Sequence, residues 1–242
     1  MNVLVVGGSS GIGLSIVLNF VKRDEVEKIY VLDKLFFPDQ YHDAKIFFST
    51  CDLASNDLSV LDGITDIHAL FITAGFGHLK LFQELTDLYI QDVFLVNAVA
   101  PIRIIRHYYD RLLSKEDFYC AVMVSIAARL SSPLFSVYSA SKAALSKFIE
   151  AVNVELDVQN SENRILEVSP GSIDGTSFTG GVSKPEQTAD LASEIIKRAM
   201  LHEDLFIPQY ETVFKDVIAR YEKSAHQFGV ESYHYKIEHG RI

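Results

Sequence analysis

The chain has 242 residues, 48% of them hydrophobic and 22% charged, with a formal net charge of −10 and a pI near 5.2. This length is enough for one domain with a sizeable core, and the composition excludes a disordered chain. The negative charge disfavours a nucleic-acid or acidic-membrane partner, because phosphate groups require a basic face. Two cysteines without CxxC spacing, Cys51 and Cys120, favour a reduced, cytoplasmic setting.

The chain opens directly on an apolar stretch, residues 2–6, with no charged segment before it. A removable signal peptide needs such a segment, so none is expected. We find no apolar run that approaches the roughly eighteen residues needed to span a bilayer. The sequence therefore predicts a cytoplasmic protein without a membrane partner.

Short apolar runs alternate with longer helical patterns along most of the chain. Strands are predicted near residues 2–6, 28–32, 45–49, 67–72, 119–125, 164–168 and 204–207. Helices are predicted near 11–23, 55–61, 84–113, 136–158, 187–201 and 210–224. Strands without in/out alternation indicate a mostly parallel sheet buried on both faces. The prediction is a doubly wound, Rossmann-like α/β fold, a single domain over 1–242, in which 225–242 is a tail without a predicted structure.

A glycine-rich turn, VVGGSSGIG, joins the first predicted strand to the first predicted helix. Its glycines allow a tight turn and a close approach of the backbone to a pyrophosphate, while the helix N-terminus directs free amides at that group. An ordinary strand-to-helix turn is the alternative, but the placement favours dinucleotide binding. The residues expected to contact the dinucleotide here are Gly7, Ser9, Ser10, Gly11, Ile12 and Gly13.

Asp33 ends the second predicted strand, twenty residues after Gly13. A carboxylate there accepts hydrogen bonds from ribose hydroxyls and repels a 2′-phosphate, which favours NAD over NADP. Lys34 follows immediately and is the one nearby cation that would favour NADP. The expected cofactor is NAD, with NADP as the alternative.

Tyr138 and Lys142 form a Tyr-x-x-x-Lys pair, and Ser125 precedes the tyrosine by thirteen residues. On a helix, four residues rise about 6 Å and return to the same face. A phenol has an ordinary pKa of about 10, and a neighbouring cation favours its ionised form, so the pair suits proton transfer. The same spacing occurs at 30/34 and 41/45, without a serine thirteen residues upstream, so the pair alone is weak evidence.

Together, the glycine turn, Asp33 and the Ser125, Tyr138 and Lys142 set resemble the short-chain dehydrogenase/reductase family, over residues 3 to about 207. The resemblance implies a seven-stranded Rossmann-like domain that assembles as a homodimer or homotetramer. It also implies that Tyr138 is the general acid/base, that Lys142 binds the nicotinamide ribose and lowers the tyrosine's pKa, and that Ser125 positions the substrate oxygen.

Asn97 matches the family's fourth catalytic residue, on the long central helix. Pro101 lies four residues later and cannot donate to the carbonyl of Asn97, which we expect to be free to hold a water behind Lys142. A proline kink that only shapes helix packing is the alternative.

The resemblance implies further cofactor contacts after the third, fourth and sixth strands. They are Asp52, Leu53, Ala74, Gly75, Pro170, Gly171 and Ile173. Three positions depart from the family pattern: Val6, Thr73, and Thr176, which lies one residue late and leaves its cofactor contact in doubt. The segment 175–185 is expected to be a short substrate lid.

The leading hypothesis is an NAD-dependent oxidoreductase acting on a secondary alcohol or its ketone. A non-catalytic nucleotide-binding regulator or scaffold is the alternative from another class, and an NADP-linked carbonyl reductase differs only in its cofactor. No metal site is expected, because the histidines near the C-terminus lack ligand spacing. Phe76, His78, Leu134 and Phe178 are candidates for the substrate side.

Overall fold

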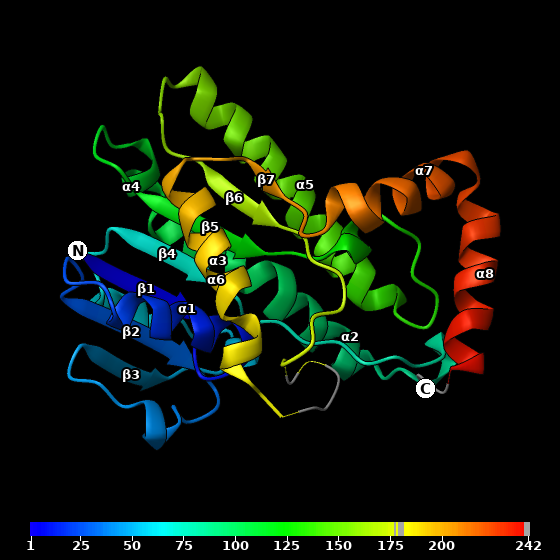
Figure 1. Ribbon diagram of the computed structural model, residues 1–242, viewed down its shortest axis with the longest axis horizontal. Helices are drawn as coiled ribbons and strands as arrows, with labels where there is room; N and C mark the ends of the chain where they lie inside the picture. The colour runs from blue at the N-terminus through cyan, green and yellow to red at the C-terminus, as the bar shows by residue number, and fades with distance from the viewer. Residues whose placement is uncertain (177, 179–181, 240–242) are drawn as a thin grey trace.

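Seven parallel strands form one sheet in the order β3-β2-β1-β4-β5-β6-β7 (Figure 1). The structure is a computed structural model, and it describes residues 1–176, 178 and 182–239. The strands are β1 (Asn2–Val6), β2 (Lys28–Asp33), β3 (Ile46–Thr50), β4 (Ala69–Ile72), β5 (Tyr119–Met123), β6 (Ile165–Val168) and β7 (Leu205–Phe206). The order reverses at β1 and β4, which places a crevice beyond their carboxyl ends.

Helices cover both faces of the sheet, which confirms the predicted doubly wound fold (Figure 1). They are α1 (Gly11–Val21) and α6 (Pro185–Met200) on one face, and α2 (Asp87–Phe94), α3 (Ala100–His107) and α5 (Ser136–Val158) on the other. Because side chains alternate along a strand, Val3 and Val5 of β1 enter the core with α1 and α6. Leu4 and Val6 enter the other core, with α3 and α5.

The helix predicted near 55–61 is wrong. The structure has two 3₁₀ turns there, Leu53–Ser55 and Ser59–Gly63, and Asn56 between them is left-handed with φ of 60°. The carboxylates of Asp52 and Asp57 each accept a hydrogen bond from a backbone amide two residues on. Such local bonds compete with a helix, and the sequence contains an aspartate or asparagine at each of these turns.

The long helix predicted over 84–113 is interrupted. Helix α2 passes into a π-helical turn, Leu95–Val99, which is followed by α3 and then by the short α4 (Tyr109–Leu113). Pro101 lies just after the π turn, and its missing N–H and bulky ring disfavour a regular helix through this point. The structure therefore supports the proline's effect on helix shape, and a free carbonyl at Asn97 stays a prediction.

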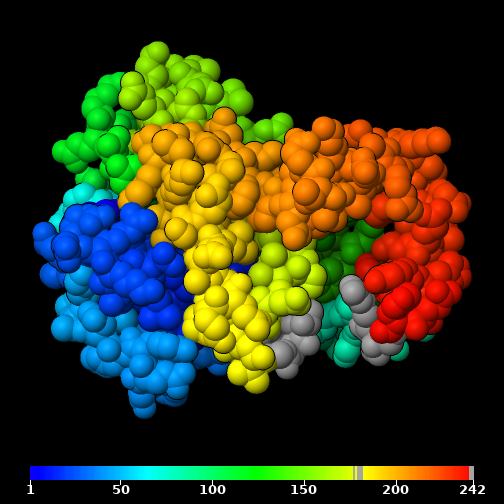
Figure 2. Space-filling view, viewed as in Figure 1, coloured from blue at the N-terminus to red at the C-terminus, as the bar shows by residue number. Residues whose placement is uncertain are grey.

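The C-terminal segment, for which no structure was predicted beyond 224, is helical. A π-helical turn, Tyr210–Phe214, leads into α7 (Lys215–Lys223) and α8 (Ala225–Glu238). These helices project from the sheet beyond its carboxyl edge, and Figure 2 shows a hollow in the surface between them and the rest of the molecule. Helix α8 escaped prediction because it buries little, so its sequence carries no apolar stripe.

One helical stretch in the described part of the chain, Asp87–His107, is long and apolar enough to cross a membrane by length and composition. The expectation that no run approaches this length is therefore wrong by that measure. The stretch contains α2 and α3, which pack against α5 within the fold. A core helix passes the same test, so this is weak evidence for a span.

Candidate active site

The backbone of the glycine turn lies so close to neighbouring backbone that a residue with a Cβ does not fit at Gly7 or Gly13. Gly7 has φ of 88°, and a Cβ on it would lie 2.4 Å from the amide nitrogen of Ala74. A Cβ on Gly13 would lie 2.1 Å from the carbonyl oxygen of Gly7. The turn after β1, the start of α1 and the turn after β4 therefore meet backbone to backbone, and Gly11, Ile12 and Gly13 open α1 as predicted.

Asp33 lies at the carboxyl end of β2 and faces the glycine turn. One carboxylate oxygen accepts a hydrogen bond from the amide of Ser9 (3.0 Å), and the other accepts one from the amide of Leu35 (3.0 Å). The Ser9 hydroxyl is buried and has no hydrogen-bond partner among the described residues. A buried hydroxyl without a partner is costly, so the turn is suited to a ligand with polar oxygens, such as a dinucleotide.

The segment after β6 passes beside the glycine turn. The amide of Gly11 donates to the Ser183 hydroxyl at 2.7 Å, and a Cβ on Gly11 would lie 3.6 Å from Cβ of Thr176. Thr176 is therefore close to the cofactor turn, although it stands one residue late in the sequence. Residues 177 and 179–181 of the predicted lid lie outside the described residues.

Asn97 is fully buried and is fixed by its side-chain amide. Its Oδ1 accepts from the amide of Phe76 (3.0 Å), and its Nδ2 donates to the Phe76 carbonyl (2.8 Å) and to the Ser141 hydroxyl (3.1 Å). Gly75 lies against this group, because a Cβ on it would lie 3.1 Å from both Asn97 Oδ1 and Lys142 Nζ. The turn after β4 thus brings Ala74 and Gly75 to the helix residues.

Ser125 follows β5 directly and lies against Tyr138 of α5. The serine hydroxyl accepts a hydrogen bond from the amide of Ala127 (3.1 Å), which fixes its orientation at the start of a short 3₁₀ turn. Burial raises the pKa of the Tyr138 phenol to about 12, and hydrogen bonding with Ser125 opposes this rise. Serine and tyrosine are therefore together, although thirteen residues separate them in the sequence.

Lys142 lies on the same face of α5 as Tyr138, with its Nζ 5.9 Å from the centre of the phenol ring. Its ammonium donates to the Met123 carbonyl (2.8 Å), and burial lowers the pKa of Lys142 to about 7. The sequence analysis expected the lysine to bring the pKa of Tyr138 down. The net shift is upward, because the phenol is enclosed and the lysine is directed at the Met123 carbonyl.

The other predicted cofactor residues lie along the same edge of the sheet. The carbonyl of Pro170 accepts from the amide of Ile126 (2.9 Å), which joins the turn after β6 to the Ser125 turn. Ile173 accepts a hydrogen bond from the Thr176 hydroxyl (2.9 Å). Gly171 packs under Phe214 of the C-terminal segment, since a Cβ on it would lie 2.4 Å from Cζ of that ring. Asp52 and Leu53 follow β3, and Leu53 is buried.

Aromatic side chains enclose the phenol ring of Tyr138. Phe135 stacks on it, with ring centres 4.2 Å apart, and Phe178 meets it edge-on at 5.3 Å. Gly77 completes the enclosure, because a Cβ there would lie 2.6 Å from Cδ2 of Tyr138. Sequence analysis named Phe178 but missed Phe135 and Gly77, although an aromatic residue three before the tyrosine was visible. Phe76 and His78, which it also named, instead pack on Tyr89.

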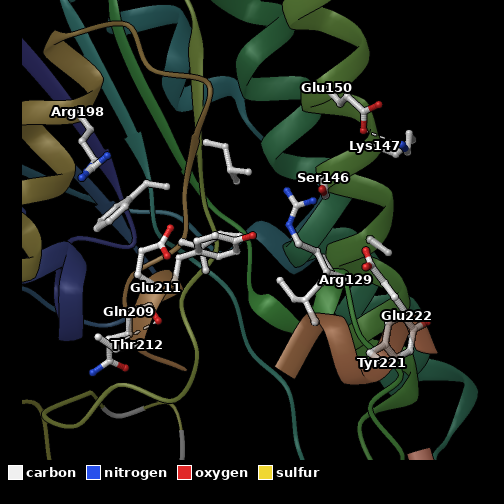
Figure 3. Close-up of a pocket in the computed structure, with 17 residues that line it drawn as sticks. Arg129, Ser146, Lys147, Glu150, Arg198, Gln209, Glu211, Thr212, Tyr221 and Glu222 are labelled. Atoms are coloured by element: carbon white, nitrogen blue, oxygen red, sulfur yellow. Dashed lines mark hydrogen bonds and ion pairs between the residues drawn. The ribbon is translucent and has the colours of Figure 1, made fainter. Parts of the chain in front are cut away.

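A cavity of about 980 Å³ lies beside α5, and Figure 3 shows the residues that line it. It is lined by residues of α5, β7 and the C-terminal segment, and none of the four predicted catalytic residues lines it. Its basic residues are ion-paired: Arg129 with Glu167, Lys147 with Glu150 and Arg198 with Glu203. The basic residues of this cavity are thus matched by carboxylates, whereas Asn97, Ser125, Tyr138 and Lys142 lie outside its lining.

Residues 1–187 match the family model described as short chain dehydrogenase. The chain belongs to the short-chain dehydrogenase family. An uncharacterized oxidoreductase of Saccharomyces cerevisiae is a relative, 24% identical over 206 residues, which are 80% of this chain and 65% of the relative. The chain thus spans less than two thirds of the length of that curated relative. The helices α7 and α8 lie beyond the part that the short-chain dehydrogenase model matches.

Solved structures of similar fold include a short-chain dehydrogenase from Streptomyces avermitilis, with a TM-score of 0.75 and 20% identity over 100% of this chain and 99% of that chain. A 4-hydroxyisoleucine dehydrogenase complexed with NADH and succinate has a TM-score of 0.66 and 21% identity over 85% and 96% of the two chains. An alcohol dehydrogenase from Thermococcus sibiricus complexed with 5-hydroxy-NADP has a TM-score of 0.68 and 17% identity over 85% and 94%. This likeness shows the short-chain dehydrogenase fold.

Proposed function

We propose that this short-chain dehydrogenase transfers a hydride between a nicotinamide dinucleotide and a secondary alcohol or its ketone, with Tyr138 as the general acid/base. The observation that carries the proposal is the convergence of Asn97, Ser125, Tyr138 and Lys142 beside the glycine turn, where the buried Ser9 hydroxyl has no hydrogen-bond partner among the described residues. A non-catalytic regulator would not require four such groups in one place.

The chain's own residues would hold the dinucleotide along the carboxyl edge of the sheet. The amides at the start of α1 and the hydroxyls of Ser9 and Ser10 would bind its pyrophosphate. Asp33 would accept from the adenosine ribose, and Asp52, Leu53, Ala74, Gly75, Pro170, Gly171 and Ile173 would border the rest. When bound, the nicotinamide ring supplies the acceptor or donor of the hydride.

The proton would move at the Tyr138 oxygen. In alcohol oxidation the substrate O–H bond breaks, its proton passes to the phenolate of Tyr138, and the carbon releases a hydride as the C=O double bond forms. Ser125 would hold the substrate oxygen, and Lys142 would stabilise the phenolate. Burial raises the pKa of Tyr138 to about 12 even with the opposing hydrogen bond to Ser125, so a charged Lys142 would be needed to bring it back toward neutral pH.

NAD is the proposed cofactor, because the carboxylate of Asp33 already faces the glycine turn and would repel a 2′-phosphate. Lys34 stands beside it, but its ammonium lies over the Phe76 ring, 5.7 Å from the ring centre. Thermal shift with NAD and with NADP tests this assignment. A larger shift with NAD is expected, and a clear preference for NADP would contradict the role of Asp33.

The reaction is tested by a panel of secondary alcohols, with NADH formation as the readout. Tyr138→Phe keeps the ring and its packing while it removes the proton-transfer group. A loss of at least about a hundredfold in turnover is expected, which is the size of a general acid/base effect. Equal activity in the two proteins would end the assignment of Tyr138, and cofactor binding without any turnover would favour the regulator.

We further propose a cytoplasmic, homo-oligomeric enzyme whose partner is its small-molecule substrate. The net charge of −10 supports the absence of a nucleic-acid partner. The aromatic enclosure of Tyr138 favours a small or partly apolar substrate. Electrophoretic mobility shift with duplex DNA at low salt tests the charge argument, and saturable binding would contradict it.

A further inference from the structure

The C-terminal helix α8 packs on the loop that leads into the catalytic helix. Lys236 donates hydrogen bonds to the Ser132 hydroxyl (2.9 Å) and to the Pro133 carbonyl (2.8 Å). Gly229 lies about two helical turns before Lys236, on the same face of α8. It is buried, and a Cβ on it would lie 3.9 Å from Pro133 and from Ser131. Helix α8 thus contacts three consecutive residues of this loop, although about a hundred residues separate the two segments.

The contacted loop is held in a conformation that its sequence does not favour. Leu134 has φ of 67°, the left-handed region that a residue with a Cβ rarely adopts. The Leu134 carbonyl accepts from the amide of Lys80 (2.8 Å), and the carbonyl just before it, on Pro133, accepts from Lys236. Strained backbone of this kind persists where neighbouring contacts fix it from several sides, and α8 supplies one of those sides.

Phe135, the residue after Leu134, connects this fixed loop to Tyr138. Phe135 stacks on Tyr138 with ring centres 4.2 Å apart and an angle of 23° between the rings. Because Phe135 also precedes α5 directly, its backbone sets where the first turn of that helix begins. A change in the Ser131–Phe135 loop would therefore move both the ring that covers Tyr138 and the turn that bears it.

We infer that Lys236 is a positioning residue, which fixes the Ser131–Phe135 loop from α8 and so keeps Phe135 stacked over Tyr138. This inference rests on the proposed function only in assigning the acid/base role to Tyr138. It gives the C-terminal helix, which lies beyond the residues that the family model matches, a part in the site. Lys236 acts through Phe135, which contacts Tyr138 and meets Phe178 with ring centres 6.1 Å apart, so we expect the effect at the side of Tyr138 that these rings cover.

Chemical accessibility of Tyr138 tests the inference without a known substrate. Nitration of tyrosines by tetranitromethane, followed by peptide mass spectrometry, gives a rate for Tyr138 and for Tyr108, which is 3% exposed in the core formed with α3 and α5 and serves as the internal control. Lys236→Met keeps the apolar stem and removes the donor. Because Lys236→Met removes the hydrogen bonds to Ser132 and Pro133, it is expected to speed nitration of Tyr138 at least about tenfold and to leave the nitration rate of Tyr108 unchanged.

Lys223→Met, on the exposed face of α7, is the matched control, and Lys236→Arg should restore most of the protection because it keeps the donors. With an alcohol that the wild type oxidises, Lys236→Met should lower kcat/KM about tenfold while the dissociation constant for NADH stays within about twofold. An unchanged nitration rate at Tyr138, or a parallel rise at Tyr108 that signals general loosening, would overturn the inference. Protection that depends on Lys236 in a protein without turnover would leave the inference standing and defeat the proposed function.

Discussion

Tyr138 and Lys142 are both buried, and burial moves their pKa values in opposite directions. The pKa of the phenol rises to about 12 and that of the ammonium falls to about 7, because each group is favoured in its neutral form. In its neutral form the phenol can donate a proton but cannot accept one. Acceptance of a substrate proton by Tyr138, as proposed above, would therefore require the phenolate with a charged Lys142 beside it.

The depressed pKa of Lys142 predicts how stability depends on pH. Between about 7 and the ordinary value of 10.5, the unfolded chain holds a proton that the folded chain has released, so the free energy of unfolding should rise with pH over this window. Between about pH 7 and pH 9, the free energy of unfolding of the wild type should rise by at least about 1 kcal/mol relative to that of Lys142→Met. Urea denaturation at several pH values measures this, and a difference that does not change with pH would contradict it.

At the level of elements, a buried ion pair connects three elements near the carboxyl edge of the sheet. Glu167 on β6 is 4% exposed and pairs with Arg129 (2.7 Å), which follows the Ser125 turn. Its carboxylate also accepts from the hydroxyls of Ser146 on α5 (2.8 Å) and Ser169 (2.7 Å). One acidic side chain thus connects the sheet, the Ser125 turn and the helix that bears Tyr138.

Replacing Glu167 alone should lower the free energy of unfolding more than replacing both Glu167 and Arg129. Glu167→Gln leaves the Arg129 guanidinium without its counter-charge and should lower the free energy of unfolding by about 2 kcal/mol, since the arginine is partly exposed. The double change Glu167→Met with Arg129→Met should cost less. Urea denaturation compares the two, with the exposed pair Lys147–Glu150 as the control, where Lys147→Ala should have no measurable effect. An unchanged free energy of unfolding in Glu167→Gln would show that the ion pair does not stabilise the contact between these elements.

The elements differ in how far the sequence could predict them. Buried strands and α1, α5 and α6 were predicted because continuous apolar runs and 3.6-residue periodicity reflect burial directly. The breaks at Asn56 and Pro101 depend on local hydrogen bonds and on a π turn, which periodicity does not record. Ser125, Tyr138 and Lys142 were predicted from their spacing together with the glycine turn and Asp33, whereas Gly77 and Phe135 gain their significance only from a contact made by folding.

At the scale of the whole molecule, exposed apolar residues on the outer face of α5 predict that two copies of the chain associate through this helix. Val154 and Val158 are 58% and 76% exposed on a helix whose other side is core. Exposed apolar residues along one helix favour a contact with a second copy. Sedimentation velocity should give a mass that is a multiple of 27.1 kDa, and Val154→Glu should reduce it to that of one chain. Leu201→Glu, at an exposed apolar position after α6, should leave the assembly intact. A monomeric wild type would contradict this prediction.

In the proposed reaction, hydride leaves a substrate carbon for the nicotinamide while Tyr138 accepts the proton of the substrate hydroxyl. The most direct measurement uses a secondary alcohol deuterated at its carbinol carbon, with NAD, and follows the label by mass spectrometry. The account predicts that each NADH formed carries one deuterium and that Tyr138→Phe slows its appearance at least about a hundredfold. Unlabelled NADH, or transfer of the label at an equal rate in the variant, would contradict it.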